Sequence, residues 1–170
     1  MPQRRVSVLL DGTSQDLPVG RRSVAGIRVL LGCDENDSLV LLSEGVDRAL
    51  LDTEELEITG GQVFATVQRR LYRGSPRHER TPAMGVKGTI CPKGVHPQAL
   101  LDSSYGCEEE AARWAVTDEG CAFCARSDNA GGWHGYPVRP SHVPIKIIRQ
   151  LLHDGKLNAR TLSADKLCTG

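Results

Sequence analysis

The sequence of 170 residues contains few aromatic residues, 4%, and its Lys and Arg exactly balance its Asp and Glu. It has no apolar run near the roughly 20 residues that a membrane-spanning helix needs, and its first residues lack the apolar stretch of a secretory signal. These absences argue against a membrane protein, a secreted protein and a strongly basic nucleic-acid-binding protein. A cytoplasmic location is expected. With 39% hydrophobic residues, the chain can nevertheless form a core.

The balance of charge differs between the two parts of the chain. Residues 1–68 hold 6 Lys and Arg against 11 Asp and Glu, whereas residues 69–170 hold 15 against 10. This contrast indicates a boundary near residue 68. We predict a domain over residues 1–68, a basic linker over residues 69–83, and a second domain over residues 84–170. The excess of positive charge in the second part is too small to indicate nucleic-acid binding.

The first part alternates short apolar runs with turn residues. Asp11 and Gly12 form a dipeptide that favours a tight β-hairpin. Ser23 can cap a helix whose apolar residues recur at helical spacing, and Gly32 supplies a left-handed stop. Strands are predicted over residues 6–11, 15–19, 39–42, 48–50 and 63–67. The predicted order of elements is a hairpin, a helix, a strand, a short strand and a last strand. This is the order of a β-grasp fold, and the alternative is another small α+β domain.

These segments also resemble the bacterial ubiquitin-like proteins of the multiubiquitin type. The resemblance covers residues 6–67. It rests on Val-Leu-Leu-Asp-Gly at 8–12, Val-Leu-Leu-Gly at 29–32, Asp-Glu-Asn-Asp at 34–37, the acidic stretch at 52–57, and Val-Phe-Ala-Thr-Val at 63–67. It implies a ubiquitin-like β-grasp domain without a cofactor, and protein partners such as E1-like or E2-like conjugation enzymes.

A conjugated modifier needs a flexible tail that ends in glycine, because the terminal carboxylate must enter a narrow enzyme site. Residues 68–74 resemble the basic, leucine-containing tail of ubiquitin and end at Gly74. The last residue of the sequence, Gly170, is the second candidate for the conjugated end. The alternative interpretation of the arginines near residue 70 is a solvated linker, or a surface that docks an acidic partner.

The second part is predicted to be a small α+β domain. Turn residues separate three segments that favour a β-meander, and strong helix formers precede them. Asn158 can cap a short helix, and Pro144 can begin another, with Ile145, Ile148, Leu151 and Leu152 on one face and Gly155 as its stop. The predicted elements are a strand at 85–91, a helical turn at 96–101, a helix at 107–112 and the meander at 113–116, 121–125 and 133–136. The fold class of the whole chain is therefore predicted as α+β.

Six cysteines in a protein without a secretory signal are expected to be reduced thiols or metal ligands. One possible zinc set is Cys107, Cys121, Cys124 and His134. If residues 121–125 form a strand, however, Cys121 and Cys124 point to opposite faces, whereas a zinc site needs both on one side. Buried thiols that behave as small hydrophobic groups are the alternative.

Trp133, His134, Tyr136 and His142 form the other candidate site. A histidine at the end of a hairpin can act as a general base or a metal ligand, as in small nucleases. No clear carboxylate accompanies these histidines, so an amphipathic strand with a partly exposed His134 is the simpler interpretation.

The leading hypothesis is a non-catalytic ubiquitin-like protein or adaptor in a bacterial conjugation or defence system. The alternatives are a small effector enzyme with a nuclease-like C-terminal domain and a zinc-stabilised binding module.

Overall fold

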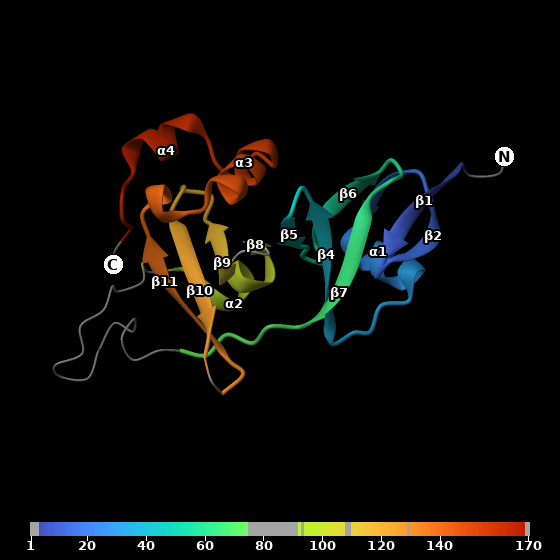
Figure 1. Cartoon of the computed structure of the whole chain (residues 1–170), viewed down its shortest axis with the longest axis horizontal. Coiled ribbons are helices and arrows are strands. Elements are labelled where there is room, and N and C mark those ends of the chain that lie inside the picture. The colour runs from blue at the N-terminus through green and yellow to red at the C-terminus, as the bar shows by residue number, and fades with distance from the viewer. Residues whose placement is uncertain (1–3, 75–91, 93, 108–109, 129, 169–170) are drawn as a thin grey trace. The chain divides into compact units, whose positions relative to one another are not determined.

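The structure is a computed structural model that describes residues 4–74, 92, 94–107, 110–128 and 130–168 (Figure 1). The chain divides into two compact units, Met1–Arg69 and Arg70–Gly170. Among the described residues, no helix is long and apolar enough to cross a membrane. The predicted strand at 85–91 lies outside the described residues.

The first unit begins with a hairpin of β1 (Arg5–Leu10) and β2 (Thr13–Pro18), which pair antiparallel. The turn consists of Asp11 and Gly12, whose φ angles of 49° and 77° lie in the left-handed region. Asp and Gly tolerate this region better than most residues, so the predicted turn is confirmed.

The predicted helix is α1 (Val24–Leu31). The Ser23 side chain accepts a hydrogen bond from the Gly26 N–H at 3.2 Å, and Gly32 ends the helix with a φ of 70°. Both predicted ends are confirmed. Ile27 on the inner side of α1 is fully buried, and burial of such a side chain contributes about 1.5–3 kcal/mol.

The remaining strands of the first unit complete a mixed sheet. They are β4 (Asp37–Ser43), β5 (Val46–Ala49) and β7 (Val63–Gln68), and the strands lie in the order β2-β1-β7-β4-β5. β1 and β7 are parallel, and the other neighbours are antiparallel. A separate two-stranded pair, not predicted, joins β3 (Gly20–Ser23) to β6 (Glu55–Ile58). α1 packs on one face of the sheet, and the shared core consists of Val8, Leu17, Val24, Ile27, Leu31, Leu39, Leu50, Ile58 and Phe64.

The second unit contains an antiparallel meander, drawn from yellow-green to orange in Figure 1. The predicted meander is confirmed as β9 (Glu110–Val116), β10 (Ala122–Ser127) and β11 (Trp133–Val138). A further strand, β8 (Tyr105–Cys107), pairs with β9. The short helix α2 (Pro97–Asp102), which confirms the predicted helical turn, packs against β9.

The chain ends with the 3-10 helix η1 (Pro140–His142) and the helices α3 (Ile145–His153) and α4 (Ala159–Ala164). The predicted cap of α4 is confirmed, because the Asn158 side chain accepts from the Thr161 N–H at 3.0 Å. Four residues were predicted to form the buried face of α3, and this prediction is only partly correct. Ile147 and Leu151 are buried, whereas Ile145 is 61% exposed and Leu152 is 40% exposed.

The predicted α+β fold class is wrong, because the described chain is mostly β with only about 22% helix. The largest single error is the helix predicted at 107–112, where the structure has the end of β8 and the beginning of β9. The glutamates at 108–110 favour a helix by propensity alone. Pairing of β9 with strands on both sides outweighs that preference, which is a few tenths of a kcal/mol per residue.

Candidate functional site

One face of the sheet in the first unit carries a row of three apolar side chains. Leu9 lies opposite Val63 on the parallel neighbour β7, and Val63 lies opposite Leu42 on β4. Directly opposed residues of neighbouring strands point to the same face of a sheet. Their sequence neighbours Leu10, Phe64 and Leu41 pack into the core with α1. The row therefore lies on the face away from α1.

The row is accessible to a partner. Leu9 is 39% exposed and Leu42 is 41% exposed. Ser14 on β2 and Asp47 on β5 continue the row at its two ends, so polar groups border the apolar centre. Single exposed apolar residues are ordinary on protein surfaces. Three in register across adjacent strands, with polar ends, have the composition of a protein-binding surface.

A second apolar area lies on the outer side of α1. Val29 is 81% exposed and Leu30 is 46% exposed. Together with Arg21, Arg22, Ser23 and Gly26 they line a shallow hollow. The Arg21 Nε lies 2.6 Å from a carboxylate oxygen of Glu55, so the charge of Arg21 is already partly balanced.

The first tail candidate, Gly74, directly follows residues that are held in the second unit. The Arg73 N–H donates to the Trp133 carbonyl at 2.6 Å, and the Trp133 N–H donates to the Leu71 carbonyl at 2.9 Å. Gly74 itself is exposed. The chain before it is therefore bound along an edge of β11, and this part of the predicted linker belongs to the second unit.

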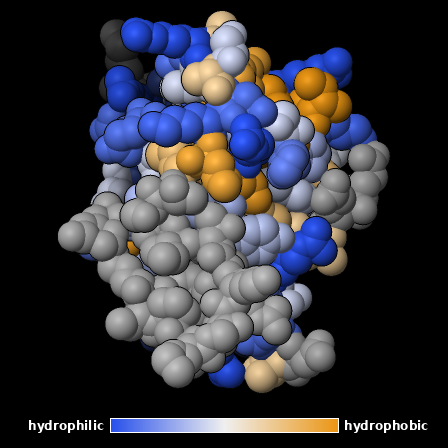
Figure 2. Space-filling model, turned by 90° about the vertical axis from the view of Figure 1, so that its left-hand side faces the viewer, coloured by the Kyte–Doolittle hydropathy of each residue, from blue (hydrophilic) through white to orange (hydrophobic). Residues whose placement is uncertain are grey.

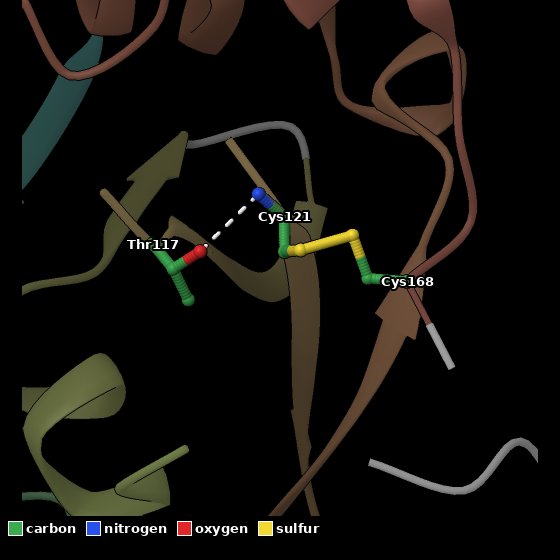
Figure 3. The surroundings of a disulfide bond; sticks show 3 residues. All are labelled: Thr117, Cys121 and Cys168. Carbon is green, nitrogen blue, oxygen red and sulfur yellow. Dashed lines mark hydrogen bonds between the residues drawn. A yellow bond between two sulfur atoms is a disulfide. The ribbon is translucent and has the colours of Figure 1, made fainter. Parts of the chain in front are cut away.

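The second tail candidate, Gly170, lies outside the described residues, but the chain just before it is cross-linked. Cys168 forms a disulfide with Cys121 (Figure 3). The Cys121 N–H also donates to the Thr117 hydroxyl at 3.2 Å, which fixes the end of the β9–β10 turn. The expectation that all cysteines are reduced or bind metal is therefore wrong for this pair. The sequence offered no signal for it, because the partners are 47 residues apart.

The cysteines and histidine of the proposed zinc set are not assembled into a site. Cys121 is bound to Cys168, and Cys107 and Cys124 are buried thiols. Cys124 lies on β10 between Trp114 on β9 and Tyr136 on β11. Within the described residues, no group of three or more His, Cys, Asp or Glu side chains is placed to hold a metal ion.

The two candidate histidines lie on different elements. His134 is a half-buried residue of β11 opposite Arg126, and His142 is exposed in η1. His134 is partly exposed as expected, but residues 133–136 are all half-buried, so β11 lacks the alternation of an amphipathic strand. One carboxylate interacts electrostatically with each histidine, Asp128 with His134 and Asp165 with His142. Each carboxylate is also held by hydrogen bonds from neighbouring groups. Asp128 accepts from the backbone N–H groups of Ala130 and Gly132, and Asp165 accepts from the N–H and hydroxyl of Ser141.

The pKa shifts near the meander have structural causes. Burial raises the pKa of the Tyr136 hydroxyl above its usual range, and a hydrogen bond with the Cys124 thiol acts in the same direction. Burial also raises the pKa of the Cys33 thiol in the first unit. Both effects disfavour the ionised forms, so these groups are weak nucleophiles at neutral pH.

Figure 2 looks onto the second unit and shows its hydrophobic residues in small areas among hydrophilic ones. The exposed large hydrophobic residues of this unit include Leu71, Ile145 and Leu152. The apolar row of the first unit could not be found from the sequence, because it depends on the strand register.

Comparison with models of protein families, with curated proteins and with solved structures finds no match to this chain.

Proposed function

We propose that the protein is a non-catalytic, ubiquitin-like adaptor that binds a partner protein through the row Leu9–Val63–Leu42. The observation that carries the proposal is the row itself: Leu9 and Leu42 are exposed, the half-buried Val63 lies in register between them, and polar residues border both ends. A flat, three-residue apolar centre with polar ends suits a protein surface better than a small molecule, which needs a concave site.

The contacts of the residues that precede the two tail candidates support an adaptor rather than a conjugated modifier. Arg73, just before Gly74, is bound to β11, and Cys168, two residues before Gly170, is cross-linked to Cys121. A conjugated terminus must extend freely into the enzyme that activates it. The contacts of Arg73 and Cys168 with the second unit would first have to be broken.

The partner that fits has an apolar patch with basic residues at its rim. The first 68 residues carry 11 acidic against 6 basic side chains, and Asp47 lies at one end of the row. Complementary charge mainly increases the rate and specificity of association, while the apolar centre supplies affinity. The E1-like and E2-like enzymes of a bacterial conjugation system are the partners we propose to test first.

The test uses purified E1-like and E2-like enzymes and isothermal titration calorimetry. Leu9→Ser and Leu42→Ser should each weaken binding by about tenfold, because each removes one apolar contact from the centre of the interface. Val29→Ser is the matched control, since Val29 is an exposed apolar residue on the helix side of the same unit. Equal binding by wild type and both row variants would refute the proposal.

Conjugation is tested in the same reaction by adding ATP and measuring intact mass. The adaptor proposal expects binding without a covalent adduct. An adduct through the carboxylate of Gly170, or of a chain truncated at Gly74, would instead identify a modifier. No described contact favours the nuclease-like enzyme or the zinc module, and we do not propose either.

A further inference from the structure

The segment 70–73 lies in the second unit as a short extended strand. Tyr72 forms a parallel β-bridge with Trp133 at the start of β11. Two backbone hydrogen bonds flank the bridge, from the Arg73 N–H to the Trp133 carbonyl at 2.6 Å and from the Trp133 N–H to the Leu71 carbonyl at 2.9 Å. Addition of an extended segment to a strand edge is a common mode of peptide recognition.

Gln98 on α2 binds the backbone of the same segment through both ends of its side-chain amide. Its Oε1 accepts from the Tyr72 N–H at 2.8 Å, and its Nε2 donates to the Arg70 carbonyl at 2.8 Å. Nε2 also donates to the Asp102 carboxylate at 2.8 Å, which fixes the orientation of the amide. Gln98 and the edge of β11 thus bind alternate backbone groups of the segment. These contacts do not depend on which side chains the segment carries.

Tyr72 lines one side of an apolar pocket that is bordered by α2 and the meander. Leu100 and Leu101 of α2 line this pocket together with Phe123 and Ala125 of β10. Gly135 of β11 lies beside the ring, and a Cβ at this position would be at ordinary contact distance, 3.8 Å, from Tyr72 Cε2. The walls of this pocket are almost entirely apolar, so the surface that the Tyr72 ring contacts suits an aromatic side chain.

The two arginines of the segment also meet specific surfaces. The Arg70 guanidinium lies over the Trp133 ring, 5.6 Å from its centroid, which is within the range of a cation–π interaction. The Arg73 side chain crosses Gly132 so closely that a Cβ there would lie 2.3 Å from its Cδ. Leu71, between them, is 59% exposed. The site thus selects residues 70, 72 and 73 of the segment and leaves residue 71 outside.

We propose that the second unit carries a recognition site for extended peptides in which a basic residue precedes an aromatic residue by two positions and an arginine follows. The chain's own segment 70–73 occupies the site, and a partner protein with the same pattern competes with it. Because the segment is part of the same chain, its effective concentration at the site is on the order of millimolar. Partner binding therefore requires displacement of the internal segment. The proposal concerns the second unit alone and does not depend on the first unit being ubiquitin-like.

The test uses the full chain and a fluorescein-labelled peptide with the sequence of residues 69–74. Fluorescence anisotropy should show weak binding to wild type, because the site is occupied. A variant with Arg70→Ala and Tyr72→Ala should bind the peptide at least about tenfold more tightly, since the internal segment has lost its cation–π contact and its aromatic ring. Leu71→Ala is the matched control and should bind like wild type, because Leu71 is exposed.

Two further arms establish where the peptide binds. A peptide with alanine in place of its tyrosine should fail to bind the double variant, and Gln98→Ala added to the double variant should abolish binding of the original peptide. If the folded double variant binds the peptide no better than wild type, or if the tyrosine-free peptide binds equally well, the proposal is wrong.

If the double variant does not fold, limited trypsin digestion tests instead whether Gln98 holds the segment 70–73 on the second unit. Trypsin cleaves after arginine, and mass spectrometry separates cleavage at Arg70 and Arg73 from cleavage elsewhere. Gln98→Ala should accelerate cleavage at these two sites by about tenfold, because the two hydrogen bonds between the Gln98 side chain and the backbone of the segment are lost. Gln150→Ala, which removes a partly buried amide bonded to Asp154 on α3, is the control and should leave the rate unchanged. Equal rates in all three proteins would overturn the proposal.

Discussion

Asp11 combines a turn conformation with a contact to a distant strand. Its φ is 49°, and its carboxylate accepts from the Thr66 N–H at 2.9 Å and from the Thr66 hydroxyl at 2.7 Å. Asp11→Ala should lower the free energy of unfolding of the first unit by about 1–3 kcal/mol, because it removes both bonds and places alanine in a left-handed conformation. Urea unfolding followed by circular dichroism measures this loss.

Asp11→Asn is the matched control for that substitution. Asparagine tolerates the left-handed region and keeps one oxygen that can accept from Thr66. Its effect should be roughly half as large or less. If Asp11→Ala and Asp11→Asn destabilise equally, the bonds to Thr66 are not the cause.

Asp128 in the β10–β11 turn predicts a pH dependence. Hydrogen bonds from the backbone N–H of Gly132 and then that of Ala130 lower the pKa of its carboxyl below the ordinary 3.8. A pKa that is lower in the folded state adds stability above the unfolded value, and this stability is lost as the pH falls through the folded pKa. Carbon-13 NMR should show Asp128 titrating below 3.8. Asp128→Asn should lose this pH-dependent contribution, and titration at or above the ordinary value would contradict the prediction.

The residues whose roles were predicted correctly from the sequence form hydrogen bonds with close neighbours in the chain. Ser23 caps an N–H three residues away, and Asn158 does the same for Thr161. Such local bonds have a recognisable spacing. Gln98 binds backbone groups 26 and 28 residues away, and no local pattern marks it.

At the level of elements, strands with clear turns on both sides were predictable. The Asp11–Gly12 turn and the glycine-rich turn before Trp133 located β1, β2, β10 and β11. β3 and β6 were missed because each has only four residues, and β3 directly precedes α1. The register that aligns Leu9 with Val63 depends on contacts between segments far apart in the chain, so the apolar row was not predictable.

The packing of α4 against the β9–β10 turn depends on Gly120. Its φ is 82°, and a Cβ there would lie 2.4 Å from Thr161 Cγ2. Gly120→Ala should therefore destabilise the second unit by about 2–4 kcal/mol, through the left-handed conformation and the steric conflict together. Gly155 has a φ of 68° with no heavy atom within 4 Å of such a Cβ.

Gly155→Ala separates these two contributions, because it carries only the cost of conformation, about 1–2 kcal/mol. Thermal unfolding of the two variants gives the difference. Thr161 also donates its backbone N–H to Asn158, so hydrogen exchange at α4 should rise in Gly120→Ala and stay unchanged in Gly155→Ala. Equal stability of the two variants would show that Thr161 adapts without cost.

At the scale of the whole molecule, each unit carries a separate surface. The first has the apolar row on its sheet, and the second binds the segment 70–73 with β11 and Gln98. If both proposals are correct, the chain joins two different proteins, as the adaptor proposal requires. The charge contrast between the two parts of the sequence located this division, but it could not show that the basic residues near 70 are bound to the second unit.

The disulfide between Cys121 and Cys168 closes a long loop, because the two cysteines have a sequence separation of 47. Cys168→Ser should lower the free energy of unfolding of the second unit by about 2–4 kcal/mol, because the unfolded chain regains conformational freedom. Both tryptophans, Trp114 and Trp133, lie in this unit, so tryptophan fluorescence in urea reports on it directly. Cys33→Ser is the control, since the Cys33 thiol lies in the first unit outside the bridge.

Reductant gives an independent measure of the same bond. Wild type in dithiothreitol should unfold like Cys168→Ser, and the variant should not respond to reductant. Equal stability of wild type and Cys168→Ser without reductant would contradict the cross-link. The same comparison bears on function, because reduction frees Cys168 from Cys121. A mass adduct that appears only after reduction would make the disulfide a control point for conjugation, whereas no adduct in either state is what the adaptor proposal requires.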